Sequence, residues 1–241
     1  MTTTNTSSEI HCPYCGKPYR MVTIPALWGI PERTFPSKSC GCEGEIAARR
    51  TYSYNQKLET REKTLRVSGI PKRYWDIPAD DTYLEAIENG GLFLYGDVGR
   101  GKTYLAIATM KAWMNRHRGE RALFVDSSSL FTKIREAYSN GESERDAIWR
   151  FSGVPLLVYD DFGKGKPSEW SIDIVEQIVK ERCNEMRPCV FTSQWAGKKL
   201  ISRLADGGTE ESASAIVSRI FQMCEDNIIH LEGPDRRLQG W

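Results

Sequence analysis

The sequence predicts an α/β fold, in which helices flank a parallel five-stranded sheet and a small cysteine-rich segment precedes it. Three observations support this class. Five short apolar segments with the character of buried strands alternate with stretches of helical periodicity. A glycine-rich turn joins the first of these strands to a helix. Four of the seven cysteines lie within the first 42 residues.

The composition limits the class of protein. At 241 residues, the chain accommodates one sizeable domain and a small appendage. The net charge of +1 gives no overall case for nucleic-acid binding, and no apolar run is long enough to span a membrane. Residues 1–8 are polar and uncharged, unlike a signal peptide. We therefore expect a cytoplasmic protein without a membrane partner, whose cysteines are reduced thiols or metal ligands.

Four cysteines form two close pairs separated by 24 residues: Cys12 with Cys15, and Cys40 with Cys42. Two pairs divided by a loop place four thiolates tetrahedrally around Zn²⁺, and the stretch between them has too little apolar mass to fold alone. A redox pair is the alternative, but the βαβ context that it needs is missing. We expect residues 1–45 to be a zinc-binding domain in which the four cysteines are the ligands. His11 is expected to lie outside the ligand set; the alternative is that it replaces one of the cysteines.

A charged, helical linker is expected over residues 46–67. From Glu43 to Arg73 there are eight Lys or Arg against four Glu, with tyrosines among them. Such a basic, aromatic-bearing segment suits a nucleic-acid strand, whereas the simpler interpretation is a solvated helix. The turn-forming stretch Ser68–Trp75 then opens the third predicted domain, residues 68–241; its apolar side chains either cover a nucleotide base or pack in the core.

The glycine-rich turn matches the phosphate-loop pattern G-x-x-x-x-G-K-[ST] at every fixed position. It follows the predicted strand Leu92–Tyr95 and precedes a helix, which is the context that the motif requires. Backbone N–H groups and the positive end of the helix would surround a phosphate, Lys102 would contact the β- and γ-phosphates, and Thr103 would ligate Mg²⁺. The predicted nucleotide-binding residues are Gly96, Asp97, Val98, Gly99, Arg100, Gly101, Lys102, Thr103 and Tyr104. The chain is therefore predicted to bind a nucleoside triphosphate.

The next elements alternate as an open α/β sheet requires. A helix over Thr103–Arg116 leads to a strand at Ala122–Asp126, and Ser127–Ser129 offers an N-cap for the helix that follows. After a short helix near residues 143–151, the apolar strand Val154–Asp161 ends in two acids. Ligands of such sheets bind at the carboxyl ends of the strands, so this ending predicts the second half of the nucleotide site.

The two acids at this strand end have different expected roles. Asp160 is placed to hold Mg²⁺ as a Walker-B acid. Asp161 is a candidate to polarise the attacking water, a general-base task; the alternative is a helix cap or a solvated turn acid. Glu is the more usual residue for this task, and Asp is one methylene shorter.

Polar and basic residues near the end of the chain complete the candidate site. After a helix over Trp170–Glu185, the strand Pro188–Gln194 ends in polar residues, and Gln194 is placed to orient the water or sense the γ-phosphate. A last strand is expected at Asn227–Leu231. Late arginines are candidates for stabilising charge on the transferred phosphoryl group, with surface ion pairing as the simpler alternative: Arg219, Arg236 and Arg237.

The order of these motifs resembles that of the AAA+ P-loop ATPases, and within them the replicative helicase loaders of the DnaC/DnaI type, including compact phage and prophage forms. The resemblance covers nearly the whole chain, and the cysteine pairs are similar to the zinc-binding, helicase-interaction domain of the DnaI branch. The segments that carry it are residues 68–73, Gly96–Thr103, 160–163, 192–194, 217–219 and 233–237.

The resemblance implies roles that spacing alone does not give. Gln194 takes the sensor-1 place, where the family usually has Asn; Arg219 matches the arginine finger that acts in an adjacent subunit; Arg237, with Arg236 as the alternative, matches the sensor-2 arginine. ATP, Mg²⁺ and Zn²⁺ are the implied cofactors. The implied partners are a hexameric replicative DNA helicase, single-stranded DNA and further copies of the chain.

The implied function is an ATPase that places the replicative helicase on single-stranded DNA. Alternatives are an IstB-like transposition helper ATPase, a non-hydrolysing ATP-binding adaptor and a small-molecule kinase. The cysteine-rich N-terminus favours the loader over the transposition helper, and the lid and acceptor pocket of a kinase are not evident from the sequence.

Overall fold

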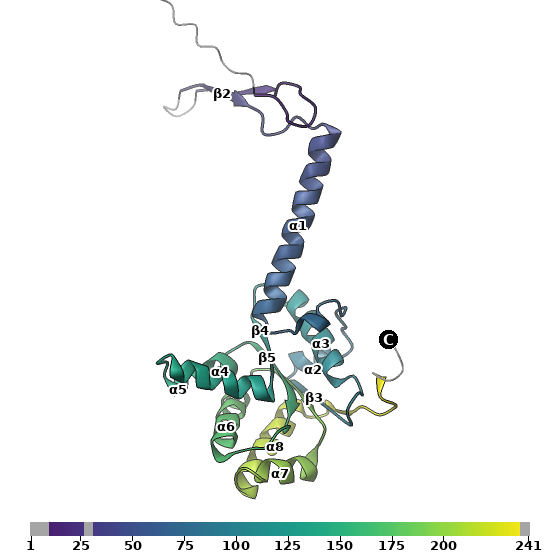
Figure 1. Cartoon of the computed structure of the whole chain (residues 1–241), viewed down its shortest axis with the longest axis vertical. Helices are drawn as coiled ribbons and strands as arrows, with labels where there is room; N and C mark the ends of the chain where they lie inside the picture. The colour runs from purple at the N-terminus through teal and green to yellow at the C-terminus, as the bar shows by residue number, and fades with distance from the viewer. Residues whose placement is uncertain (1–9, 27–30, 237–241) are drawn as a thin grey trace, which may run out of the picture. The chain divides into compact units, whose positions relative to one another are not determined.

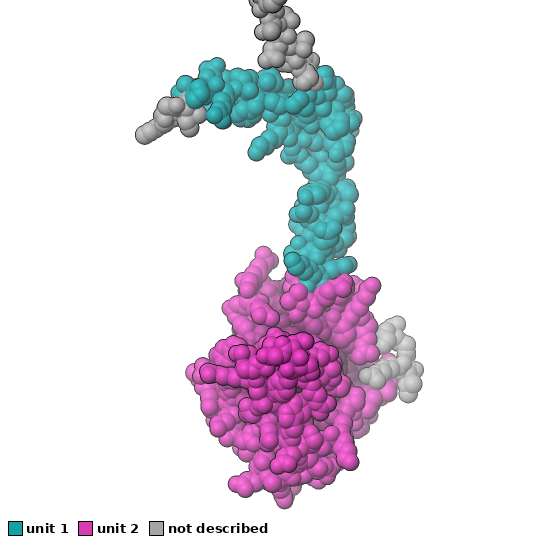
Figure 2. Space-filling model, turned by 60° about the vertical axis from the view of Figure 1, so that its left-hand side comes forward, with its two compact units in different colours: residues 1–63 teal, residues 64–241 magenta. Residues whose placement is uncertain are grey.

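The computed structural model of the chain describes residues 10–26 and 31–236. It forms two compact units, Met1–Lys63 and Thr64–Trp241, coloured separately in Figure 2. The finer division into residues 1–45, 46–67 and 68–241 stays a prediction. None of the helices in the described ranges combines the length and apolar character that crossing a bilayer requires.

The described residues of the first unit, 10–26 and 31–63, form almost no hydrophobic core. Its two strands, β1 (Met21–Ile24) and β2 (Arg33–Pro36), pair antiparallel, and every residue of β1 is solvent-exposed. Among its described residues, the buried apolar side chain is Cys12 and the buried polar one is Glu45. Helix α1 (Glu43–Val67) begins in this unit and is exposed along most of its length, as expected for a charged helix. Cysteines therefore take the place of apolar packing.

The second unit is built on a parallel five-stranded sheet with the order β4-β5-β6-β3-β7, which confirms the predicted fold class (Figure 1). The central strands are short and largely buried, as expected for strands covered on both faces, whereas β7 at the edge of the sheet is half-buried to exposed. The strands are β3 (Gly91–Tyr95), β4 (Ala122–Asp126), β5 (Leu156–Phe162), β6 (Cys189–Ser193) and β7 (Ile228–His230).

Helices cover both faces of this sheet (Figure 1). In β3, Leu92 and Leu94 pack with α2 and α3, while Phe93 packs on the other face with α4 to α8. The helical elements are η1 (Lys72–Tyr74), α2 (Leu84–Glu88), α3 (Lys102–Arg116), α4 (Ser127–Ser139), α5 (Glu144–Ser152), α6 (Glu169–Asn184), α7 (Gly197–Ala205) and α8 (Glu210–Cys224).

The N-cap of α4 differs from the prediction. The serines at 127–129 were expected to cap the helix, but α4 begins at Ser127 and Asp126 is the cap. The Asp126 carboxylate accepts hydrogen bonds from the backbone N–H groups of Ser128 and Ser129, each at 3.0 Å. A carboxylate satisfies two free N–H groups and favours the positive end of the helix, so it outcompetes a hydroxyl.

Arg182 of α6 connects the N-terminal ends of β5 and β6 to the helices that cover them. Its side chain is fully buried, at 0% exposure, and its guanidinium donates to a cluster of backbone carbonyls. The acceptors are Phe151 (3.0 Å), Ser152 (3.0 Å), Val154 (2.7 Å), Pro155 (3.3 Å) and Pro188 (2.6 Å). These carbonyls end α5 and lead into β5 and β6, so one buried cation serves as a shared donor to several polar groups; the carbonyls of Ser152 and Pro188 also accept from Arg187 and from the backbone N–H of Leu157.

Replacing Arg182 by methionine is expected to lower the free energy of unfolding by about 3 to 5 kcal/mol, because the carbonyls lose their donor without regaining water. Urea unfolding followed by tryptophan fluorescence measures the change. Arg187→Met is the matched control, since Arg187 is only partly buried and donates to Ser152 alone among these carbonyls. Equal effects of the two substitutions would contradict this role for Arg182.

Candidate nucleotide site

The strand order brings the three predicted parts of the site together. Strand β6 lies between β3 and β5, so its polar end stands between the phosphate loop and the two acids. All three meet at the carboxyl edge of the sheet, in a cleft of about 300 Å³. The predicted residues that line this cleft are Val98, Gly99, Arg100, Gly101, Lys102, Thr103, Tyr104, Asp160, Asp161 and Gln194.

The phosphate loop has the backbone shape that its glycines allow. Gly99 and Gly101 have φ angles of 80° and 85°, and Gly101 is the N-cap of α3. A Cβ atom at Gly99 would overlap the carboxylate of Asp235, so the loop is closely covered there. Lys102 is only 6% exposed, and its Nζ atom donates to the carbonyls of Gly96 and Asp97, each at 2.8 Å. The lysine therefore braces the loop that it belongs to.

Asp160 and Thr103 lie in hydrogen-bonding contact, and both carry oxygen atoms that can ligate a metal ion. The Thr103 hydroxyl lies 2.8 Å and 3.1 Å from the two carboxylate oxygens of Asp160, and the Thr192 hydroxyl donates to the same carboxylate at 2.6 Å. Burial raises the pKa of Asp160, opposed by the hydrogen bonds from Thr192 and Thr103. A buried carboxylate beside a hydroxyl is the oxygen set that Mg²⁺ prefers, and a divalent cation would compensate the buried charge.

A β-bulge turns the second acid toward the first. Pairing between β5 and β6 is regular up to Tyr159 and shifts before Phe162, where Asp161 has a φ angle of 55°. In a regular strand consecutive side chains point to opposite faces, but the extra residue lets both acids line one cleft. The backbone N–H of Asp161 donates to the Thr192 hydroxyl at 2.9 Å, which fixes the bulge.

The side chain of Asp161 is paired with a lysine that the sequence did not single out. Lys164 Nζ lies 2.6 Å from Asp161 Oδ2, and the turn between them is closed by a hydrogen bond from Lys164 N to Asp161 O at 3.0 Å. Asp161 therefore stands at the start of a tight turn and is paired within it, so its predicted role as a general base stays a prediction beside the alternative of a turn acid. Its carboxylate lies in the cleft but is held by a cation.

The arginines are distributed differently. Arg236 lies on the phosphate loop: its backbone N–H donates to the Gly99 carbonyl at 3.0 Å, and its guanidinium lies beside Gly101. Arg237 lies outside the described residues. Arg219 of α8 does not line the cleft; its guanidinium faces α6, with Nη1 4.0 Å from Glu176 Oε1. Within one chain, the structure therefore brings Arg236 to the loop but not Arg219.

Two cations of the cleft escaped prediction. Arg73, in the turn η1, and Lys164 both line it. A basic residue three positions after the Asp160–Asp161 pair is a usable signal, because a tight turn returns it to the acid. Arg73 ends the segment 68–73 that carries the family resemblance, but no local spacing relates it to the acids, because its approach to the cleft depends on contacts with α3.

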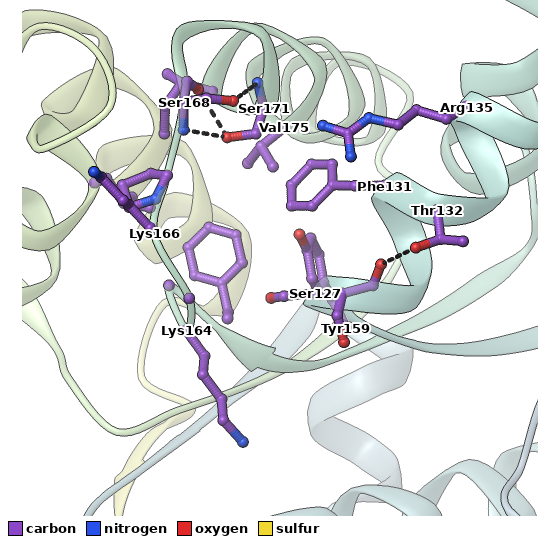
Figure 3. A pocket seen from close by; sticks show the side chains of 17 residues that line it. Ser127, Phe131, Thr132, Arg135, Tyr159, Lys164, Lys166, Ser168, Ser171 and Val175 are labelled. Carbon is purple, nitrogen blue, oxygen red and sulfur yellow. Dashed lines mark hydrogen bonds between the residues drawn. The ribbon is translucent and has the colours of Figure 1, made fainter. Parts of the chain in front are cut away.

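A second hollow of about 340 Å³ lies beyond the loop that follows β5 (Figure 3). Phe131 and Arg135 of α4 point into it on one side, and Ser168 and Ser171 at the start of α6 border it on the other. No Asp or Glu is among the described residues that line it. Lys164 lines both hollows, so it stands between this basic, aromatic pocket and Asp161.

The four predicted cysteines come together in the first unit, and the group does not include His11. Their sulfur atoms all lie within 4.8 Å of one another, with Cys12 and Cys42 3.7 Å apart and Cys15 and Cys40 3.5 Å apart. Four sulfurs bound tetrahedrally to one zinc at about 2.3 Å are separated by roughly 3.8 Å. The spacing therefore fits a Zn²⁺ ion with four thiolate ligands.

Glu45 organises the second cysteine pair. Its buried carboxylate accepts hydrogen bonds from the backbone N–H groups of Cys40 and Gly41 at 2.7 Å and 2.9 Å, and Arg49 pairs with its other oxygen at 2.9 Å. The hydrogen bond from Gly41 is the largest cause that lowers the pKa of Glu45, so the carboxylate stays charged. The first turn of α1 thus fixes the Cys40–Cys42 turn, a role that the sequence pattern did not reveal.

Substituting both Cys12 and Cys15 by serine is expected to release about one equivalent of zinc per chain, because two remaining thiolates cannot hold the ion tightly. Elemental analysis of the purified protein measures the metal. Cys183→Ser is the matched control, since Cys183 lies outside the cluster. Absence of zinc from the parent protein, purified without chelator, would contradict the assignment.

The parallel sheet, the phosphate loop and the acid pair at the strand ends define the P-loop class of nucleotide-binding fold. The family model of the IstB-like ATP binding protein matches residues 64–240. The chain belongs to this family.

Named relatives include replicative helicase loaders. The loader DnaI of Bacillus subtilis (strain 168) is 23% identical over 161 residues, which are 65% of this chain and 50% of DnaI. The loader DnaC of Escherichia coli (strain K12) is 30% identical over 109 residues, 44% of each chain. The chain thus spans about half the length of these relatives. A crystal structure of the DnaC helicase loader superposes with a TM-score of 0.52 at 24% identity, covering 67% of this chain and 98% of that one, which establishes the fold.

Proposed function

We propose that the chain is an ATPase that binds a hexameric replicative DNA helicase and places it on single-stranded DNA. The observation that carries the proposal is the convergence of the phosphate loop, both acids and Gln194 in one cleft, in a chain similar to DnaI and DnaC. The cysteine cluster supports a separate unit for holding the helicase.

Each cleft residue then has a definite task. ATP supplies the phosphoanhydride bond that is cleaved. Lys102 would turn from its loop carbonyls to the phosphate oxygens, and Thr103 with Asp160 would hold a Mg²⁺ ion that neutralises phosphate charge. Gln194 orients the attacking water, and Asp161 accepts its proton. Arg237 is the candidate for the sensor-2 role, and Arg236, whose guanidinium lies beside Gly101, is the alternative.

The pairing of Asp161 with Lys164 bears on the rate. The Asp161 carboxylate accepts a hydrogen bond from the Lys164 ammonium at 2.6 Å, so the ammonium occupies an oxygen that would otherwise face the attacking water. Hydrolysis therefore requires that Lys164 move from Asp161, and we propose slow turnover by the isolated chain. This same contact is the observation that favours the second candidate, an ATP-binding adaptor that switches without appreciable hydrolysis.

A third candidate is a helper ATPase for transposition, which the name of the matching family favours. It differs from a loader in the partner protein that it captures and in the form of DNA on which it acts. A loader captures the replicative helicase and acts on single strands; a transposition helper captures a transposase and acts on duplex DNA.

Co-purification with the host's replicative helicase, with and without ATP, tests the proposal, followed by helicase unwinding from a closed single-stranded circle. We expect capture, and unwinding that depends on this chain. The Cys12→Ser, Cys15→Ser double variant should lose capture while keeping nucleotide binding. Failure to capture the helicase under both conditions would contradict the loader, and ATP binding without turnover in the captured complex would establish the adaptor instead.

A further inference from the structure

We propose that Arg73 is a same-chain cation for the terminal phosphate of the bound nucleotide, positioned by Lys111. The inference rests on the proposed function and deepens it. Arg73 lines the nucleotide cleft together with Thr103, Asp160 and Asp161. It also lines an adjoining hollow, and Asp160 and Asp161 line that hollow too. Because the acids mark the end of the cleft where the metal and the attacking water belong, Arg73 lies at the terminal-phosphate end.

The charge of Arg73 is available, whereas the other cations of the cleft are engaged. Lys102 donates to loop carbonyls, Arg100 lies 3.4 Å from Asp97, and Lys164 lies 2.6 Å from Asp161. No carboxylate lies within ion-pair distance of Arg73 in the part of the chain that the structure describes. Its guanidinium lies 4.5 Å from the centroid of the Tyr74 ring. Contact with an aromatic face orients the planar group and leaves its N–H edges for phosphate oxygens.

Lys111 fixes the segment that carries this arginine. It is a lysine of α3 with only 8% exposure, and its Nζ atom donates to three carbonyls: Tyr74 at 2.8 Å, Trp75 at 3.0 Å and Ile77 at 2.7 Å. These carbonyl acceptors help to make the burial of the ammonium tolerable. Since α3 begins at the phosphate loop, Lys111 ties the Arg73 turn to the helix that carries Lys102 and Thr103.

The contact predicts selective binding of the triphosphate. Titration calorimetry with ADP and with the non-hydrolysable analogue AMPPNP measures the ratio of the two affinities. Arg73→Ala should lower AMPPNP affinity about tenfold while changing ADP affinity less than about twofold, as expected for loss of one charge-assisted hydrogen bond. The AMPPNP affinity of Arg73→Lys, which keeps the charge, should lie between those of the parent protein and Arg73→Ala. Lys72→Ala is the matched control, because Lys72 belongs to the same turn, is exposed and does not line the cleft.

The positioning role of Lys111 has its own readout. Lys111→Met should lower the AMPPNP-to-ADP ratio as Arg73→Ala does, and the double variant should lower it no further, since both act through one contact. Overall stability alone would not produce this lack of additivity.

The outcomes separate the inference from the function on which it rests. Suppose that the parent protein prefers AMPPNP and that Arg73→Ala lowers the affinities for both nucleotides equally, or lowers neither. This result would overturn the role of Arg73 and leave the proposed ATPase function intact. A parent protein that binds neither nucleotide would overturn the proposed function and this inference together.

Discussion

Replacing Arg219 by alanine is expected to reduce ATP turnover about 1,000-fold while ATP affinity stays within about twofold of the parent. Arg219 lies on α8 against Glu176 of α6 and does not line its own cleft. In the predicted arginine-finger role, it would therefore reach the terminal phosphate bound to a neighbouring copy of the chain. Steady-state turnover and calorimetric binding of AMPPNP separate the two effects.

Mixing variants tests whether Arg219 acts between copies. Asp161→Asn protein lacks the proposed base but keeps Arg219, so at a shared interface it supplies the arginine to the intact cleft of an Arg219→Ala copy. A mixture of the two should regain turnover that neither has alone. Lys199→Ala, at an exposed position of α7, is the control and should leave turnover unchanged. No recovery in a mixture that forms oligomers would contradict a role in trans.

Replacing Lys102 by alanine is expected to weaken binding of AMPPNP by about 100-fold or more, which corresponds to loss of two charge-assisted hydrogen bonds. The substitution also removes the brace between Lys102 and the carbonyls of Gly96 and Asp97. Both effects act on the phosphate loop, so ADP affinity should fall too, unlike the selective loss expected at Arg73.

Calorimetry with both nucleotides measures this loss. Arg116→Ala is a suitable control, because Arg116 ends the same helix and forms an exposed ion pair with Glu88. Unchanged AMPPNP affinity in Lys102→Ala would remove the phosphate loop from the proposed site.

Features encoded by neighbouring residues could be predicted from the sequence. The positive φ angles at Gly99 and Gly101, and the start of α3 at Lys102, follow from the loop motif itself. The five strands follow from local apolar runs. The four-cysteine cluster follows from the spacing of its two pairs, and its geometry is confirmed.

Features that depend on long-range contacts could not be predicted. The bulge at Asp161 requires Thr192 of β6, and the place of Arg73 requires Lys111 of α3. The sequence pattern gave no role to Glu45, one acid of a charged segment, although its carboxylate holds the Cys40–Cys42 turn. The roles assigned to the cleft residues and to Arg219 stay predictions, because they concern bound ATP and a second copy of the chain.

The bulge in β5 fastens the acid pair to the hydrophobic core. Tyr159 and Phe162, on either side of it, are both buried, and their rings meet edge-on at 5.1 Å. Straightening the strand would turn Phe162 out of its packing, at a cost of about 2 to 3 kcal/mol. The backbone under Asp160 and Asp161 is therefore anchored between two buried aromatic side chains. We expect nucleotide binding to move side chains such as Lys164 rather than this part of the backbone.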